Sequence, residues 1–232
     1  MKRYTAIVTA RGGSKGLLGK NLRVLDGKSL LRRTLDAALG VAAVSHVAVT
    51  TDDPDIARES AVAGVHVIDR PAELATDEAS SVDTVVHALS VLNALGLLER
   101  HFVLLQPTSP MRTSFHLEQC LALLEAASEG SCTVSVCDLE HHPLKALIEH
   151  DGRLKPVSGD WNTLHQPRQL LGRACRPNGA IYAMGVEDFL AHRQFLFEPL
   201  VPYFMSTEDS VDIDTAKDLE QARKILAARK SL

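Results

Sequence analysis

The sequence predicts an α/β fold in which helices cover both faces of a mainly parallel sheet. Short apolar runs of the kind found in buried strands alternate with helical segments along most of the chain. A glycine-rich stretch directly follows the first of these runs, at the sheet end where open α/β folds bind ligands. The chain has 232 residues and 45% hydrophobic content, so we expect one domain over residues 1–232 with a sizeable core.

The first predicted unit is strand, loop, helix, strand. Residues 5–10 are an apolar run that opens into the glycine-rich stretch at 11–20. Leucines and alanines at helical spacing mark a helix over 30–39, which Gly40 closes, and residues 46–51 form the next strand. The glycine-rich stretch is therefore expected at the carboxyl end of a strand.

The same alternation continues towards the middle of the chain. After a helix that begins at Pro54, the expected elements are strands at 65–68, 102–105 and 133–136 with helices at 82–95 and 117–127. Asp52 and Asp53 stand just before Pro54, where acidic residues commonly cap a helix. We therefore assign this pair to capping rather than to chemistry.

Regular alternation stops between His141 and Arg176. Prolines and glycines punctuate short pieces of this segment, at Pro143, Gly152, Pro156, Gly159, Pro167 and Gly172. We predict that residues 141–176 leave the sheet as a small, hairpin-like excursion. A strand pattern resumes at 178–184, and Thr215-Ala-Lys-Asp218 is a capping-box signature for a final helix.

Composition and charge exclude several classes of protein. The formal net charge of -4 at pH 7 supplies no global basic surface, so neither nucleic acid nor an anionic membrane is an expected partner. The four cysteines form no CxxC pair and have no zinc-like spacing, which indicates reduced thiols. The first residues contain no signal-peptide core, and no apolar run is long enough to span a bilayer. We expect a cytoplasmic protein.

The glycine-rich stretch also carries three cations, Arg11, Lys15 and Lys20. This combination suits a polyphosphate, because glycines let backbone amides approach phosphate oxygens and cations offset the phosphate charge. It is not a Walker A loop, since Ser14 stands where the first glycine belongs and Asn21 replaces the hydroxyl residue. No Gly-x-Gly-x-x-Gly register fits, which argues against a dinucleotide fold.

A pair of carboxylates, Asp212 and Asp214, precedes the final helix. In an extended segment both side chains point to one face, and together they could share a magnesium ion. Spacing alone leaves open the alternative that Asp214 caps the helix.

Several motifs occur in order along nearly the whole chain, and together they resemble the acylneuraminate cytidylyltransferases, or CMP-sialic acid synthetases. The motifs are Ala10-Arg-Gly-Gly-Ser-Lys-Gly with Lys20-Asn21, Arg70-Pro-Ala-Glu-Leu, Gln106-Pro-Thr-Ser-Pro-Met-Arg112, His141-His-Pro-Leu-Lys145, Gln166-Pro-Arg168, Arg176-Pro-Asn-Gly-Ala-Ile-Tyr182 and Asp209-Ser-Val-Asp-Ile-Asp-Thr215. The resemblance implies a Rossmann-like nucleotidyltransferase fold, CTP as the donor and a requirement for Mg²⁺. It also implies a homodimer in which the excursion reaches over the active site of the partner.

The resemblance further implies a role for each of a set of single residues. The expected catalytic residues are Arg11, Lys15, Lys20 and Asp214, and the expected metal ligands are Asp212 and Asp214. The expected nucleotide-binding residues are Arg11, Lys15, Lys20, Asn21, Arg70, Ser80 and Ser81. The expected sugar-binding residues are Gln106, Lys145, Arg168, Arg176, Asn178, Tyr182 and Phe195. Leu196 stands where the family pattern has a second aromatic residue of the acyl pocket, which leaves the acyl preference open.

The reaction expected from the resemblance joins a nonulosonic acid sugar to CMP. The 2-hydroxyl of the sugar would attack the α-phosphorus of CTP, and pyrophosphate would leave. The base that removes the proton is left open between Asp214 and a metal-bound hydroxide. The alternatives are the same chemistry on legionaminic, pseudaminic or a shorter 2-keto-3-deoxy acid and, more remotely, a nucleotide-binding regulator without turnover.

Overall fold

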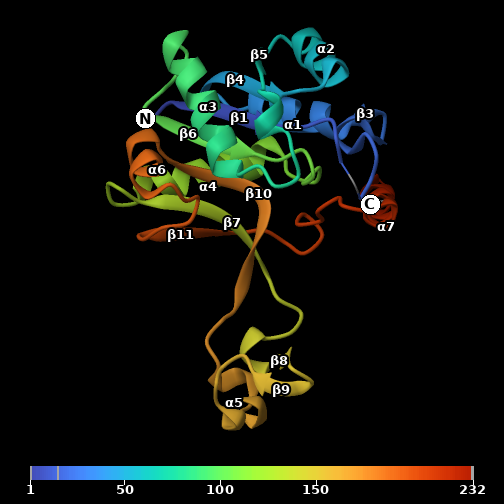
Figure 1. The fold of residues 1–232 in the computed structure, drawn as a ribbon, viewed down its shortest axis with the longest axis vertical. Coiled ribbons are helices and arrows are strands. Elements are labelled where there is room, and N and C mark those ends of the chain that lie inside the picture. Colours follow the sequence, from blue (N-terminus) through green and yellow to red (C-terminus); the bar gives the residue numbers. More distant parts are fainter. Residues whose placement is uncertain (1, 15, 231–232) are drawn as a thin grey trace.

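A seven-stranded sheet forms the centre of the protein, with strand order β11-β7-β10-β6-β1-β4-β5 (Figure 1). The structure is a computed structural model that describes residues 2–14 and 16–230. The strands of this sheet are β1 Tyr4–Thr9, β4 Val44–Thr51, β5 His66–Asp69, β6 His101–Leu105, β7 Cys132–Asp138, β10 Cys175–Gly185 and β11 Leu200–Phe204.

The sheet is mainly parallel, as predicted. β1 pairs in parallel with β4 and β6, β4 pairs in parallel with β5, and β11 pairs in parallel with β7. The exception is β10, which runs antiparallel between β6 and β7. The carboxyl ends of β1, β4, β5 and β6 therefore meet at one edge of the sheet, where open α/β folds bind ligands.

Helices cover both faces of the sheet because the strands alternate their apolar side chains. Tyr4, Ala6 and Val8 of β1 belong to one buried cluster together with α1 and α4, whereas Ile7 belongs to a second cluster together with α3 and α6. The helices are α1 Leu30–Leu39, α2 Pro54–Val62, α3 Ser81–Ala94, α4 Ser114–Ala126, α5 Trp161–His165, α6 Val186–His192 and α7 Ala216–Lys230.

Some short elements were not expected from the sequence. They are the hairpin of β2 Val24–Leu25 and β3 Lys28–Ser29, helix α6, strand β11, and the single 3₁₀ turns η1 Lys20–Leu22, η2 Ala72–Leu74, η3 Pro143–Lys145 and η4 Arg168–Leu170. Pro202 lies inside β11, where it is tolerated because this strand forms one end of the sheet.

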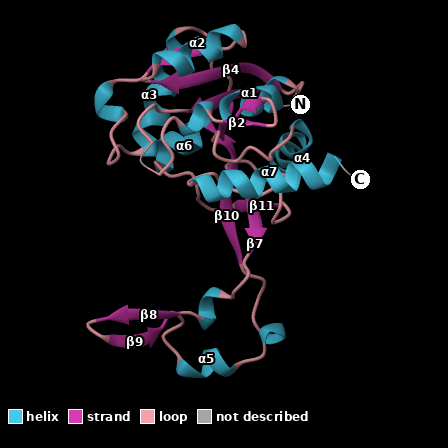
Figure 2. Cartoon of the chain, turned by 90° about the vertical axis from the view of Figure 1, so that its right-hand side faces the viewer, coloured by secondary structure: helices cyan, strands magenta, loops and turns pink. Residues whose placement is uncertain are grey.

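The segment 141–176 projects from the body beyond the ends of β7 and β10 (Figures 1 and 2). We call this segment the arm. It contains an antiparallel hairpin of β8 Leu147–His150 and β9 Arg153–Pro156, followed by α5, which confirms the predicted hairpin. The last two residues of the predicted range already belong to β10.

In the part of the chain that the structure describes, no helix combines the length and the apolar character needed to cross a bilayer. The four cysteines are free thiols, of which Cys175 is exposed.

Candidate active site

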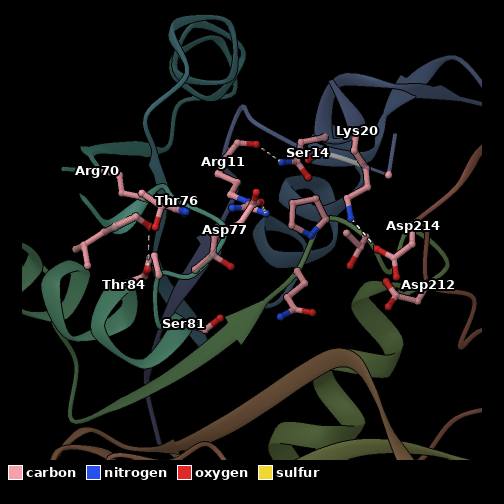
Figure 3. Close-up of a pocket in the computed structure, with 18 of the residues that line it drawn as sticks. Arg11, Ser14, Lys20, Arg70, Thr76, Asp77, Ser81, Thr84, Asp212 and Asp214 are labelled. Atoms are coloured by element: carbon pink, nitrogen blue, oxygen red, sulfur yellow. Dashed lines mark hydrogen bonds and ion pairs between the residues drawn. The ribbon is translucent and has the colours of Figure 1, made fainter. Parts of the chain in front are cut away.

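A pocket of about 560 Å³ opens at the carboxyl edge of the sheet. Its walls come from the loop after β1, the turn after β5, the start of α3, the loop after β6 and the segment before α7. The lining residues are Thr9, Arg11, Ser14, Gly16, Lys20, Asn21, Arg70, Leu74, Thr76, Asp77, Ala79, Ser81, Thr84, Gln106, Pro107, Thr108, Asp212, Asp214 and Thr215. Figure 3 shows Lys20 and the two aspartates at one end of the pocket, Arg70 and Ser81 at the other, and Arg11 between them.

The loop after β1 packs closely against the segment before α7. A Cβ atom built on Gly16 would lie 2.6 Å from the backbone oxygen of Asp214, so only glycine fits at this position. The side chain of Asn21 donates from Nδ2 to the backbone oxygen of Arg11 at 2.9 Å and closes the loop on itself. Lys15, which we predicted to bind phosphate, lies outside the described residues.

The described cations of the loop each contact a carboxylate. Arg11 donates from Nη2 to Asp77 Oδ1 at 2.6 Å, and Lys20 Nζ lies 2.9 Å from Asp214 Oδ1. Both pairs line the pocket and are partly exposed to solvent, so their net contribution to stability is small and an incoming anion can compete for the cations.

A third cation, Arg70, follows β5 and is buried. Its Nη2 donates to the backbone oxygen of Thr50 at 2.6 Å. Burial lowers the pKa of Arg70 to about 10, so the guanidinium remains charged at neutral pH. Three described cations therefore line one pocket.

The aspartates before α7 point into the same pocket. Ile213 between them is fully buried, and its backbone nitrogen donates to the backbone oxygen of Thr108 at 2.7 Å. This contact holds the segment extended, so Asp212 and Asp214 face one side, as their spacing predicted. Burial raises the pKa of Asp212, and the neighbouring charge of Asp214 adds to that rise. Asp212 Oδ1 is buried and has no hydrogen-bond partner among the described residues.

The alternative that Asp214 caps the final helix is excluded. Thr215 is the cap, because its Oγ1 accepts from the backbone nitrogen of Asp218 at 3.3 Å. Asp218 Oδ2 in turn accepts from the backbone nitrogen of Thr215 at 2.7 Å, which completes the predicted capping box. The carboxylate of Asp214 is left to the pocket and to Lys20.

The assignment of Asp52 and Asp53 was right for one residue and wrong for the other. Asp53 caps α2, since its Oδ1 accepts from the backbone nitrogens of Asp55 at 2.8 Å and Ile56 at 3.1 Å. Asp52 Oδ1 instead accepts from the backbone nitrogen of Gly12 at 3.0 Å, in the loop after β1. This contact could not be predicted from the sequence, because the two segments lie forty positions apart.

The start of α3 forms the far wall of the pocket. Ser81 is the first residue of the helix and lines the pocket, so the positive end of the helix dipole is directed at it. Ser80 does not line the pocket. It caps α3, its side chain accepting from the backbone nitrogens of Val82 and Asp83. Nucleotide binding by the Ser80 side chain therefore stays a prediction.

Of the residues expected to bind the sugar, Gln106 lines the pocket. Its backbone oxygen accepts from Nη1 of the buried Arg112 at 3.1 Å, and the same Nη1 donates to the backbone oxygen of Ala180 at 2.8 Å. Gly179, at φ +79, leaves space beside Gln106, since a Cβ atom there would lie 3.1 Å from Gln106 Oε1.

Three other predicted sugar residues do not line the described surface of the pocket. Asn178 is buried: its Oδ1 accepts from Ser135 at 2.6 Å and its Nδ2 donates to Ser210 at 2.8 Å. The oxygen and the nitrogen of the Asn178 side chain thus both have hydrogen-bond partners within the fold. Tyr182 and Phe195 pack on each other with ring centroids 5.8 Å apart. Contact of these side chains with a sugar stays a prediction.

The remaining predicted sugar residues, Lys145, Arg168 and Arg176, belong to the arm segment, and none of them lines the described pocket of its own chain. Arg168 donates from Nη2 to the backbone oxygen of Glu140, directly before the arm. Arg176 lies at the start of β10, where its charge offsets a small part of the rise that burial causes in the pKa of Asp212. The described pocket thus brings together most of the predicted nucleotide residues and both predicted metal ligands, but not the arm cations.

Several pocket residues were missed by sequence reasoning. Asp77 and Thr76 lie between η2 and α3, and Thr108 accepts from Ile213 while it lines the pocket. None of these positions carries a spacing signal. They can be found only once the order of the strands is known.

A family model described as cytidylyltransferase matches residues 5–231. The chain is 35% identical over 217 residues to an N-acylneuraminate cytidylyltransferase of Escherichia coli, covering 94% of this chain and 50% of that protein. It is 29% identical to a CMP-N,N'-diacetyllegionaminic acid synthase of Legionella pneumophila, covering 97% of this chain and 96% of that protein. The chain thus spans about half the length of its Escherichia coli relative.

Among solved structures, a CMP:2-keto-3-deoxy-manno-octonic acid synthetase complexed with CTP has a TM-score of 0.70 at 20% identity, covering 98% of this chain and 99% of that one. At that identity the likeness shows the fold alone, which is the predicted nucleotidyltransferase fold. The family model spans nearly the whole described chain and includes every wall of the pocket. The chain therefore belongs to the cytidylyltransferase family.

Proposed function

We propose that this protein couples CTP to a nonulosonic acid of the sialic acid type, giving the CMP-sugar and pyrophosphate. The observation that carries the proposal is the pocket itself, which is lined by three described cations and by the pair Asp212 and Asp214. A cationic glycine-rich loop beside two carboxylates is what transfer of a nucleotidyl group from a triphosphate requires. Relatives with sialic-acid-type substrates in their names support the choice of sugar.

In this mechanism the 2-hydroxyl oxygen of the sugar attacks the α-phosphorus of CTP in line. A new C2–O–P bond forms while the bond between the α-phosphorus and the bridging oxygen breaks, and pyrophosphate leaves with that electron pair. Arg11 and Lys20 bind the triphosphate and stabilise the charge on the departing group. The proton of the hydroxyl passes to a carboxylate of the pair. Asp214, which is exposed in the pocket, is our candidate.

Asp212 and Asp214 are also our proposed ligands for Mg²⁺. This ion prefers one or two carboxylates together with phosphate oxygens and water, and the unpartnered, buried Oδ1 of Asp212 fits such a ligand. Among the described residues, no group of three or more histidines, cysteines or acids is placed to hold a metal ion by itself. The pair therefore suits an ion that arrives with the triphosphate. When bound, Mg²⁺ would neutralise charge on the transferring group.

We further propose a homodimer in which Lys145 and Arg168 of the arm complete the sugar side of the partner's pocket. The arm exposes large apolar side chains that a second copy would cover, at Leu144, Leu147, Ile148, Leu154, Val157, Trp161 and Leu170. A two-fold arrangement lets identical arms exchange such contacts. The exposed free thiol of Cys175 supports a reducing, cytoplasmic setting.

A pyrophosphate-release assay tests the proposed function. It crosses the four nucleoside triphosphates with sialic, legionaminic, pseudaminic and eight-carbon 2-keto-3-deoxy acids, each with Mg²⁺ or with excess EDTA. We expect release only when CTP, a nine-carbon acid and Mg²⁺ are present together. Release from another nucleotide would contradict the donor, and full activity in EDTA would remove the metal assignment. Binding of CTP without any turnover would instead indicate a nucleotide-binding regulator.

A further inference from the structure

The turn between β4 and α2 carries two adjacent aspartates whose side chains accept hydrogen bonds from different segments. Asp53 accepts hydrogen bonds from the first backbone nitrogens of α2. Asp52 contacts the glycine-rich loop, where its Oδ1 accepts from the backbone nitrogen of Gly12 at 3.0 Å. A carboxylate from a helix-capping turn therefore contacts the backbone of the loop that carries Arg11.

The loop lies directly on this turn. A Cβ atom built on Gly12 would lie 2.5 Å from Asp53 Oδ2 and 3.0 Å from Asp53 Cβ, so the position admits no side chain. Gly12 therefore brings its backbone against the turn, which is what places its N–H group within reach of Asp52.

Both polar atoms of the peptide group between Arg11 and Gly12 are held. The oxygen accepts from Asn21 Nδ2 at 2.9 Å, and the nitrogen donates to Asp52 Oδ1 at 3.0 Å. Because a peptide group is planar and rigid, two hydrogen bonds at its opposite sides define its orientation. That orientation sets the direction in which Arg11 leaves the backbone and enters the pocket.

Asp52 itself does not line the described surface of the pocket. It lines a neighbouring hollow together with Asp53, Asp69, Arg70 and Thr76. Asp52 also provides the opposing negative charge for the buried Arg70, favouring its charged form against burial. It thus supports two pocket cations from outside, where it does not touch a ligand.

We infer that Asp52 is a positioning residue for the triphosphate: it fixes the Arg11–Gly12 peptide group so that Arg11 and the loop amides meet the phosphate oxygens. This inference rests on the proposed use of CTP. It assigns Asp52 to the binding of the triphosphate and not to the binding of the sugar, which is expected on the other side of the pocket.

The experiment compares Asp52→Ala, Asp52→Asn and the matched control Asp53→Ala. KM for CTP, KM for the sugar and kcat are measured, and pyrophosphate binding is measured by calorimetry. We expect Asp52→Ala to raise KM for CTP and to weaken pyrophosphate binding by about tenfold, with KM for the sugar unchanged within about twofold. Asp52→Asn keeps an acceptor oxygen, so its KM for CTP and its pyrophosphate binding should each differ from those of the wild type by only about threefold. Asp53→Ala should lower Tm and leave KM for CTP unchanged.

An unchanged KM for CTP in Asp52→Ala, or equal changes in Asp52→Ala and Asp53→Ala, would overturn the inference. Asp52→Ser, whose hydroxyl is too short to reach Gly12, provides the same test if the alanine variant does not fold. Failure of the proposed function can be distinguished from failure of this inference, because the wild type would then release no pyrophosphate from CTP. In that case the calorimetric comparison of pyrophosphate binding still decides the role of Asp52.

Discussion

The pocket and the arm differ in how completely a single chain builds them. Around the pocket, loops from several strand ends are joined by short hydrogen bonds, such as those of Asn21 to Arg11 and of Ile213 to Thr108. In the arm, Ile148 and Trp161 are more than half exposed, at 57% and 56%, and Leu170 is 75% exposed. The described walls of the pocket are therefore joined within one chain, and we propose that the sugar side depends on the arm of a second chain.

This difference suggests a division of labour. Residues that bind the triphosphate need fixed positions relative to one another, and a sheet edge supplies them. We propose that residues that enclose the sugar come from a second subunit, which the exposed apolar side chains of the arm would hold in place. Changes at the pocket should therefore act within a chain, and changes in the arm should act across the dimer.

The largest expected effect separates a pocket carboxylate from a capping carboxylate. Asp214→Asn should reduce kcat by about a hundredfold or more, because it removes a charged group from the reacting end of the pocket. Asp53→Asn should leave kcat nearly unchanged, since asparagine also caps helices well. Steady-state kinetics with circular dichroism on both variants checks this. Equal losses in kcat would contradict the assignment of Asp214 to the reaction and of Asp53 to helix capping.

A smaller effect is expected at the predicted acyl pocket. Leu196 is 37% exposed and follows Phe195, which stacks on Phe189 with centroids 5.2 Å apart. A flexible aliphatic side chain gives the acyl group a less fixed wall than an aromatic ring does. Leu196→Phe should change the ratio of kcat/KM for N-acetyl and N-glycolyl substrates by about threefold. Identical ratios in the two proteins would remove Leu196 from the acyl pocket.

The smallest effect contrasts a half-buried histidine of the body with an exposed one of the arm. Burial lowers the pKa of His116, whose Nδ1 accepts from the backbone nitrogen of Thr113 at 3.2 Å. Since the folded pKa lies below the unfolded value, the unfolded chain binds more protons below that value, and stability falls as pH decreases through it.

His116→Gln keeps an acceptor for Thr113 but does not titrate. Between pH 7.5 and 5.5 the wild type should lose about 2 °C more in Tm than His116→Gln does. His165→Gln, in the exposed α5 of the arm, should lose as much as the wild type. Parallel loss in all three proteins would show that His116 does not contribute to the pH dependence.

Much of the fold could be predicted because its strands are continuous apolar runs. The run 102–105 is buried between two neighbouring strands, and its apolar pattern can be recognised without knowing which strands flank it. The direction of a strand has no such signal, so the antiparallel course of β10 was not foreseen. Strand β11 was missed because Pro202 and its alternating exposed residues resemble a loop.

The candidate site was predictable to the extent that its chemistry is local in sequence. Arg11 and Lys20 share one loop, and Asp212 and Asp214 share one extended segment, so their residue types alone pointed to phosphate and metal. Asp52 and Asp77 could not be found in this way. They reach the loop only because β4 lies next to β1 in the sheet and β5 lies next to β4.

The most direct test of the division between pocket and arm is complementation in mixed dimers. Arg168→Ala and Asp214→Asn, each nearly inactive alone, are refolded together in equal amounts with subunit exchange verified by differently tagged chains. If Arg168 acts on the partner's pocket, each mixed dimer has one site with both defects and one site with neither. Random pairing makes about half of the dimers mixed, so we predict roughly a quarter of wild-type activity. If the subunits exchange and no activity returns, Arg168 acts within its own chain, and the division proposed here is wrong.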